Sequence, residues 1–232
     1  QAENVHSADI FARLRAIPLI DPYEAYQLLD SRWKDIAVDL EILQTEGLAA
    51  ARQVDPRMVI KKKDNKDTEI QDGWQGHVIP FELAQACLLA DKLQALKEEE
   101  ERLADFAGRY EELLNELSEE DREQPFVNED AFVPAEVKKS LKAGALDEAT
   151  LAILKKVDAL ISREKSLKKK IKEDAEALHT QTKHVIENLS DGQILDLLRR
   201  KWITPLVEDL NDLPLSVVRK LIARLEALCT KI

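Results

Sequence analysis

The chain has 232 residues, a mass of 26.4 kDa and a formal net charge of -11, which allow one large domain or two small ones. Charged residues make up 34% of the sequence, aromatic residues 5%, and only 6 residues are glycine. This composition favours long amphipathic helices, so we predict an all-α fold. The acidic balance argues against a protein that binds nucleic acid over its whole surface, because such a protein needs a basic face.

The sequence also bears on the compartment. No stretch of about 18 uncharged apolar residues occurs, and the first residues lack a secretory signal, so we expect a soluble protein that makes no membrane contact. Cys87 and Cys229 lie far apart without a CxxC spacing, which predicts two buried thiols in a reducing cytoplasm. The first residue is Gln1, and we take the chain to be processed or to be a piece of a longer protein.

The first 80 residues predict a helical segment followed by a loop. Residues 1–20 suggest a short helical lead-in that stops near Pro18, and Asp21 with Pro22 then forms the start of a long helix over about 22–52. Apolar residues recur there every three or four positions and predict a face that packs in the core: Tyr26, Leu29, Trp33, Ile36, Leu40 and Leu43. Residues 53–80 predict a loop-rich insert, with room for one strand pair at 58–60 and 69–71.

Residues 81–189 predict a long antiparallel coiled-coil hairpin with a linker at 118–145. Apolar residues in both arms follow heptad spacing, although Glu100 interrupts the first arm. Residues 97–123 carry 12 acidic and 4 basic side chains, whereas 155–173 carry 8 basic and 3 acidic ones. We therefore expect the acidic run 98–101 to lie near Arg163 and Lys165, and the alternative is that each run is a solvated face.

Residues 190–232 predict C-terminal helices. Ser190 and Gln193 form a capping-box pattern for a helix that Pro205 stops or kinks, and Pro214 begins a last amphipathic helix. Such short helices need partners, so they either pack on the N-terminal helices or bind another chain.

We find no catalytic, cofactor-binding or metal-binding motif in this sequence. No GxGxxG, GxxxxGK[ST] or HExxH pattern occurs, and His179 and His184 lie on different faces of their helix. The candidate residues are instead contacts to a partner or to DNA. Two of them are tryptophans, Trp74 and Trp202. The others form three basic runs: Lys61, Lys62 and Lys63; Lys168, Lys169 and Lys170; and Arg199, Arg200 and Lys201. The alternatives are that the tryptophans are anchored in the fold and that the basic side chains are solvated.

Three segments carry a resemblance to a known family. They read VIKKKD at residues 59–64, QDGWQGHVIPFEL at 71–83 and KWITPL at 201–206. In this respect the chain resembles the distal part of modification subunits of type I restriction-modification systems, which are N6-adenine DNA methyltransferases. The likeness runs over roughly residues 30–230.

The resemblance implies a role without chemistry of its own. The family's S-adenosylmethionine-binding motif and its Asn-Pro-Pro-aromatic motif are both missing from this sequence, so the resemblance implies a region beyond the catalytic domain and carries over no catalytic residue. S-adenosylmethionine is implied for the full-length subunit only. The implied partners are the DNA-specificity subunit, the restriction subunit, and DNA through the complex. The competing hypothesis is a coiled-coil scaffold or adaptor unrelated to DNA modification, and self-association is open under either.

Overall fold

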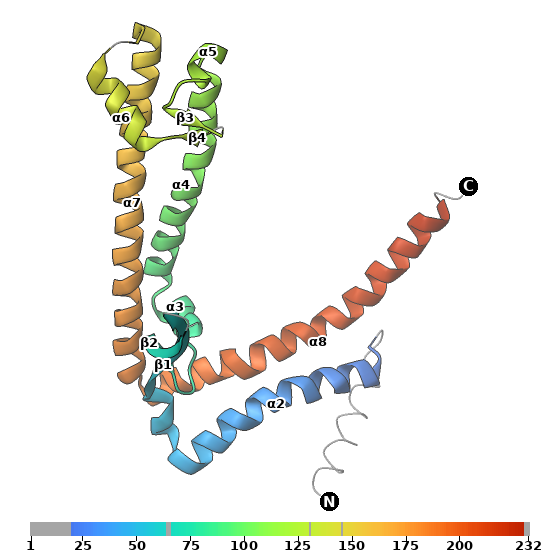
Figure 1. Cartoon of the computed structure of the whole chain (residues 1–232). Coiled ribbons are helices and arrows are strands. Elements are labelled where there is room, and N and C mark those ends of the chain that lie inside the picture. The colour runs from blue at the N-terminus through green and yellow to red at the C-terminus, as the bar shows by residue number, and fades with distance from the viewer. Residues whose placement is uncertain (1–19, 64–65, 130, 145, 230–232) are drawn as a thin grey trace, which may run out of the picture. The chain divides into compact units, whose positions relative to one another are not determined.

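The computed structural model describes residues 20–63, 66–129, 131–144 and 146–229, and these are mostly helical (Figure 1). The chain divides into two compact units. Unit 1 combines Gln1–Leu88 with Thr182–Ile232, and unit 2 is Leu89–Gln181. The N-terminal and C-terminal segments predicted separately from the sequence therefore belong to one unit, and the all-α prediction holds in outline.

Helix α2, Pro22–Glu46, begins where the sequence places it but ends before the predicted limit at about residue 52. Asp21 accepts a hydrogen bond from the Tyr23 backbone N–H at 2.8 Å, and Pro22 occupies the first turn. The helix ends at Gly47, whose φ of 79° suits glycine, and the short 3-10 helix η1, Leu48–Arg52, follows. The expected core face is only partly correct, because Trp33 is 57% exposed. The predicted lead-in lies mostly in residues 1–19, outside the described part.

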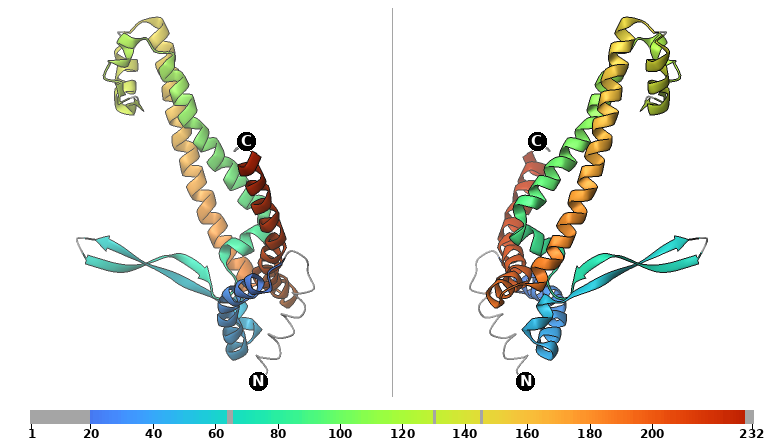
Figure 2. Two further views of the ribbon diagram at one scale, coloured as in Figure 1. Left: turned by 90° about the vertical axis from the view of Figure 1, so that its right-hand side faces the viewer. Right: turned by 90° about the vertical axis from the view of Figure 1, so that its left-hand side faces the viewer.

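The insert after η1 is a β-hairpin, and the prediction of a loop is wrong for most of it. Strands β1, Val54–Lys63, and β2, Lys66–Gly76, pair antiparallel along their length and form the long ribbon seen in Figure 2. The expected strand pair is confirmed, since Met58 faces Gln71 and Ile60 faces Glu69. The rest escaped prediction because this ribbon is mostly solvated, so its side chains lack the alternation that burial of one face imposes.

Unit 1 has its core where four elements meet. These are η1, helix α3 (Phe81–Leu88), the end of helix α7 (Glu148–Glu187) and the start of helix α8 (Asp191–Cys229). Its buried side chains are apolar: Ala50, Ala51, Val78, Ile79, Phe81, Ala84, Ile186, Leu189, Ile194, Leu197 and Leu198. The predicted capping box is present at the start of α8, where the Gln193 N–H donates to Ser190 Oγ at 3.3 Å and the Ser190 N–H donates to Gln193 Oε1 at 3.0 Å.

Helix α8, Asp191–Cys229, is one continuous helix, so the prediction that Pro205 or Pro214 separates two helices is wrong. Each proline removes one backbone N–H donor, which leaves the carbonyls of Lys201 and Leu210 without their usual partner. Contacts with α2 on both sides of Pro205 hold the helix together, and α8 curves along its length in Figure 1.

Unit 2 consists of helix α4, Ala90–Asn115, and most of helix α7, Glu148–Glu187, with the segment that connects them. The two helices run antiparallel, as three side-chain contacts at successive levels show. Lys92 donates to Gln181 at 2.5 Å, Tyr110 to Glu164 at 2.7 Å, and Lys156 to Glu116 at 3.1 Å.

The contact line on α4 follows the predicted heptad seam except at two positions, 100 and 107. Glu99 and Phe106 are buried, whereas Glu100 and Ala107, which the heptad pattern selects, are exposed. Oppositely charged side chains do meet across the two helices, but Glu99 pairs with Lys170 and not with Arg163 or Lys165. The error arises because two adjacent acidic residues give no sign of which one turns inward; the distinction depends on the helix rotation that packing selects.

The connection between α4 and α7 is ordered and is not a plain linker. It contains helix α5, Glu119–Arg122, the short strands β3, Val127–Asn128, and β4, Ala131–Phe132, and helix α6, Pro134–Ala143. Phe126 and Val137 from this connection are almost fully buried against Leu114, Leu154 and Val157. Unit 2 therefore has its own hydrophobic core at the end where the helices are joined.

Two further expectations concern the whole chain. Within the described residues no helix is both long and apolar enough to cross a membrane. Both cysteines are free thiols, but Cys87 is only partly buried and Cys229 is exposed, so the prediction of two buried thiols fails.

The Glu99–Lys170 pair generates a stability prediction for unit 2. Lys170→Met leaves the buried Glu99 carboxylate without its cation, so we expect a lower melting temperature by circular dichroism. Lys169→Met, which removes the neighbouring surface cation, should leave the transition unchanged. Glu99→Leu combined with Lys170→Met should recover the loss, and equal melting of all three variants would show that the pair does not matter.

Candidate interaction surfaces

The junction segment, residues 73–81, connects the β-hairpin to α3 and carries most of the sequence resemblance. Val78, Ile79 and Phe81 are buried in the core of unit 1. Gly73 has a φ of 86°, and a Cβ at Gly76 would lie 1.8 Å from the Ile79 carbonyl oxygen. The fold of unit 1 therefore explains why two positions of this segment are glycine and why the buried ones are apolar.

Trp74 anchors the hairpin in unit 1. It is half-buried against the core cluster, and the Lys183 ammonium lies 3.3 Å from the centre of its ring. A cation over an indole face is a favourable contact. Trp74 is therefore anchored in the fold, which was one of the two alternatives for this residue. A contact between Trp74 and a partner stays a prediction.

His77 links the base of the hairpin to α2. Its Nδ1 lies 2.7 Å from the Asp55 carboxylate and its Nε2 lies 3.7 Å from the Glu46 carboxylate. The hydrogen bond to Asp55 holds the pKa of His77 above its ordinary value of 6.5; burial opposes this shift, and the nearby charges of Asp55 and Glu46 add to it. A protonated His77 thus bridges two carboxylates on separate elements.

Asp39 on α2 is a buried carboxylate that receives two donors from α8. Lys201 Nζ lies 2.5 Å from Asp39 Oδ2, and Trp202 Nε1 donates to the same oxygen at 2.8 Å. Lys201 also donates to the Val78 carbonyl at 2.7 Å. The cluster joins α2, α8 and the junction segment, so two of the predicted contact residues, Lys201 and Trp202, are engaged inside unit 1.

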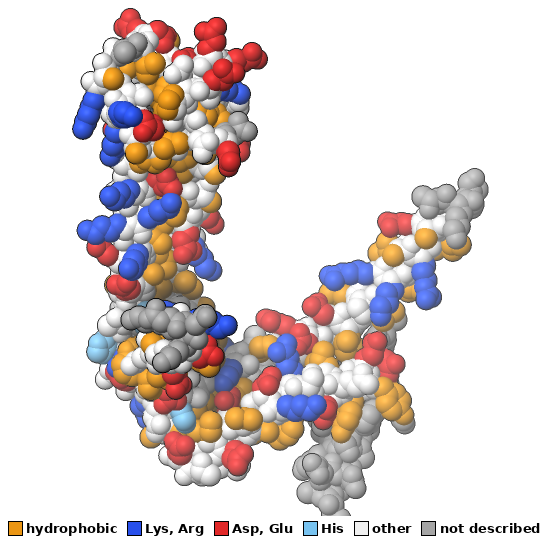
Figure 3. All heavy atoms as spheres, in the orientation of Figure 1, with side chains coloured by type: hydrophobic (Ala, Val, Ile, Leu, Met, Phe, Trp, Pro, Cys, Tyr) orange, Lys and Arg blue, Asp and Glu red, His pale blue; other side chains and the backbone are white. Residues whose placement is uncertain are grey.

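The remaining basic residues lie at the surface (Figure 3), and many have an acidic neighbour in the chain. In the hairpin Lys61 lies 3.5 Å from Asp72, Lys62 is exposed, and the side chain of Lys63 is outside the described part. On α7 Lys168 contacts Glu164 and Lys169 contacts Glu173, while Lys170 contacts Glu99. On α8 Arg200 contacts Asp196, and Arg199 is exposed. These basic runs lie on three elements, of which the β-hairpin and α8 belong to unit 1 and this part of α7 to unit 2.

Exposed apolar side chains follow the second half of α8, the face that the sequence predicts as apolar. We call this set the distal row, and its members are 40% to 62% exposed: Leu215, Val218, Leu221, Ile222, Leu225 and Leu228. In Figure 3 apolar and basic side chains lie together on the part of α8 nearest the C-terminus. A contiguous apolar row of this length is typical of a surface that another helix covers.

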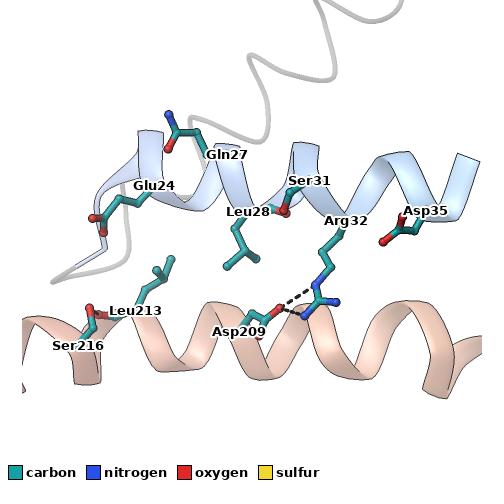
Figure 4. Close-up of a pocket in the computed structure, with 9 residues that line it drawn as sticks. All are labelled: Glu24, Gln27, Leu28, Ser31, Arg32, Asp35, Asp209, Leu213 and Ser216. Atoms are coloured by element: carbon teal, nitrogen blue, oxygen red, sulfur yellow. Dashed lines mark hydrogen bonds and ion pairs between the residues drawn. The ribbon is translucent and has the colours of Figure 1, made fainter. Parts of the chain in front are cut away.

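Next to the distal row, α2 and α8 enclose an open cleft of about 640 Å³ (Figure 4). Leu28 and Leu213 point toward each other from the two helices, and Arg32 donates to Asp209 at 2.5 Å. Glu24, near the start of α2, lines the same cleft as Ser216. The described part of α2 therefore accompanies α8 only as far as the beginning of the distal row.

Metal-binding groups and shifted pKa values are the next features of these units. Among the described residues no group of three or more His, Cys, Asp or Glu side chains could hold a metal ion. In unit 2 Glu164 has its pKa lowered by Lys168 and then by Tyr110, and the pKa of Tyr110 is raised mainly by burial. Both shifts belong to a contact between α4 and α7. No family model, curated protein or solved structure matches this chain.

The sequence did not predict that Asp39 and Glu99 are buried, nor that His77 contacts two carboxylates. Asp39 lies one turn from Asp35 on a helix rich in charge, and only its place beside the apolar Ile36 and Leu40 hints that it turns inward. His77 lies inside the quoted junction segment, but the carboxylates that contact it come from 22 and 31 positions earlier in the sequence. Such partners become neighbours only in the fold.

The Asp39 cluster predicts a large loss of stability on substitution. Asp39→Asn leaves the Lys201 ammonium partly buried without a counter-charge, so the free energy of unfolding should fall by about 2–4 kcal/mol. Urea unfolding followed by tryptophan fluorescence measures the change. Asp35→Asn, on the exposed side of the same helix, should change it by no more than about 0.5 kcal/mol. Equal effects would show that the cluster is not a stabilising centre.

His77 predicts a pH dependence of stability. The pKa of His77 is raised in the folded state. Protonated His77 therefore contributes fully to the free energy of unfolding below the unfolded pKa of about 6.5, and this contribution is lost as pH rises through the folded pKa. The unfolding free energy of the natural chain minus that of His77→Gln should therefore decrease from pH 6 to pH 9 in urea titrations. A difference that is constant over this range contradicts the bridge.

Proposed function

We propose that this chain is the region C-terminal to the catalytic domain of a type I restriction-modification modification subunit, and that it docks helices to the DNA-specificity subunit. In this role it helps to enclose DNA while the parent enzyme methylates adenine at N6. S-adenosylmethionine binds to the full-length subunit outside this chain, the restriction subunit joins the same complex, and the complex acts in the cytoplasm.

The distal row is the observation that carries the proposal. Burying one leucine that is now about half exposed gains about 1 kcal/mol, and the six members of the row lie on one face of one helix. A partner that covers them gains several such increments, which offset the cost of association. Trp33 and Ile203, on α2 and α8, add exposed apolar area in the same unit.

The second support is that the two units have different structural roles. Unit 2 has its own core, and we propose that α4 and α7 pair there as an antiparallel coiled coil whose register the Glu99–Lys170 contact selects. The junction segment and the Asp39 cluster then hold α2 and α8 in fixed relation within unit 1. In this role the part contributes packing and no catalytic group, which agrees with the sequence resemblance.

The proposal predicts a complex in solution. Light scattering after size exclusion should give the mass of a hetero-complex when the chain is mixed with the specificity subunit of the same gene cluster. Leu221→Glu with Leu225→Glu should weaken that complex at least tenfold, because both leucines would lose their burial in the interface. The matched control, Met58→Glu with Ile60→Glu on the β-hairpin, changes two equally exposed apolar residues and should leave the complex intact.

Two results would contradict the proposal. If the natural chain forms no hetero-complex and is instead a folded homodimer, the coiled-coil scaffold is the better description. If both double variants bind as well as the natural chain, docking occurs without the distal row.

A further inference from the structure

Unit 2 contains a hollow that the proposed function does not use. It lies beside the contact between α4 and α7, where β4 and the start of α6 meet the two helices, and its volume is about 330 Å³. We call it the unit 2 pocket. Its volume is near the lower end of the range for ligand sites, which suits a small molecule or a single side chain.

Most of the lining of the unit 2 pocket is apolar. Ala107 and Pro134 line it from exposed positions on α4 and α6, and Phe132 and Ile161 are half-buried on β4 and α7. The rings of Phe132 and Tyr110 have their centroids 6.4 Å apart and are tilted by 49°. Aromatic rings offer apolar area, and their faces also attract cations. The lining can therefore hold an apolar stem that carries a positive charge.

The polar side chains of the pocket accept hydrogen bonds and have none left to donate. None of the lining side chains, all within the described part of the chain, carries an N–H group. Tyr110 lines the pocket with a hydroxyl, which donates its hydrogen to Glu164 at 2.7 Å. Burial, and then the hydrogen bond to Glu164, raise the pKa of Tyr110, so the phenol keeps this hydrogen at neutral pH. A ligand that donates hydrogen bonds is therefore favoured over one that only accepts them.

The charged side chains at the pocket have an excess of carboxylates. Glu164 and Glu111 both line it. Lys168 Nζ lies 2.5 Å from Glu164 Oε1 and compensates that charge. Glu111 is exposed and makes no ion pair with any residue that the structure describes. An uncompensated carboxylate beside an apolar surface favours a cationic ligand.

An anion is the alternative ligand. Pro134 begins α6, and the N-terminus of a helix carries a partial positive charge of about half a unit. Glu136 lies in the first turn of α6 and opposes this partial charge. The full charge of the Glu111 carboxylate and the lack of side-chain donors in the lining therefore favour the cation.

We infer that the unit 2 pocket binds an organic cation, which is an ammonium or guanidinium group on an apolar stem. The stem packs against Phe132 and Ile161, and the charged group is held by the carboxylates that line the pocket. Such a group belongs either to a free small amine or to a Lys or Arg side chain of a bound polypeptide. The inference goes beyond the proposed function and does not rest on it, because the distal row belongs to unit 1.

The test uses the full chain and two small probes that share a phenyl ring and a two-carbon stem, 2-phenylethylammonium and 3-phenylpropanoate. Binding is followed by NMR through the methyl signals of Ile161. We expect the cation to bind at least fivefold more tightly than the anion, with a preference that shrinks at high salt. Equal binding of the two probes, tighter binding of the anion, or no shift of the Ile161 signals with either probe would overturn the inference.

Two substitutions with matched controls locate the binding. Ala107→Phe fills the pocket from α4 and should abolish binding, whereas Ala159→Phe, at an exposed position of α7 outside the pocket, should leave it unchanged. Glu111→Gln should weaken binding of the cation at least threefold, and Glu112→Gln, its exposed neighbour, should not. Circular dichroism should show equal helix content in all four variants. Binding that survives Ala107→Phe, or that Glu111→Gln and Glu112→Gln weaken equally, contradicts the assignment.

A third probe identifies the source of the cation. It is the tripeptide Gly-Arg-Gly with both ends blocked. If it shifts the Ile161 signals and Ala107→Phe abolishes the shift, the pocket takes a side chain of a polypeptide. If only 2-phenylethylammonium does so, the pocket takes a free small amine, and either result supports a cation site. A chain that binds the cation as expected but does not bind the specificity subunit would remove the proposed function and leave this inference standing.

Discussion

Unit 1 depends on a buried carboxylate. Asp39 is 7% exposed, and taking a carboxylate out of water is costly unless charged and polar donors satisfy it. Lys201 and Trp202 do so from α8, and Lys201 extends the network to the Val78 carbonyl of the junction segment. One network therefore couples the position of α8 to α2 and to the root of the β-hairpin. Its geometry specifies a single arrangement, which an apolar contact of the same area would specify less strictly.

Unit 2 uses the same device in a different place. Glu99 is the buried carboxylate there, and Lys170 from the opposite helix neutralises it. Apolar seams alone allow neighbouring registers of two helices, because each heptad presents a similar surface, whereas a buried charge has few acceptable positions. In both units apolar burial supplies the driving force for packing, and one ionic contact selects which packing occurs.

Much of the local structure could be predicted from particular residues. Asp21 with Pro22 predicts the start of α2, Ser190 with Gln193 predicts the start of α8, and the strand pair at 58–60 and 69–71 was foreseen. These signals work because each depends on neighbours a few positions away. The predictions failed where a distant contact outweighs a local rule. Helix α8 continues through Pro205, on both sides of which it contacts α2, and packing buries Glu99 where the heptad pattern points to Glu100.

The sequence by itself determined the helical composition, the starts of α2 and α8, the two arms of unit 2, the apolar face of the second half of α8 and the local clusters of charge. Those properties follow from composition and periodicity, which act over a few turns of chain. Only the tertiary structure decided that the first and last thirds of the chain form one unit, that Lys201 and Trp202 turn inward to Asp39, and that the distal row stays exposed. Each of these depends on which surfaces meet across more than a hundred residues, and a local pattern contains no information about its partner.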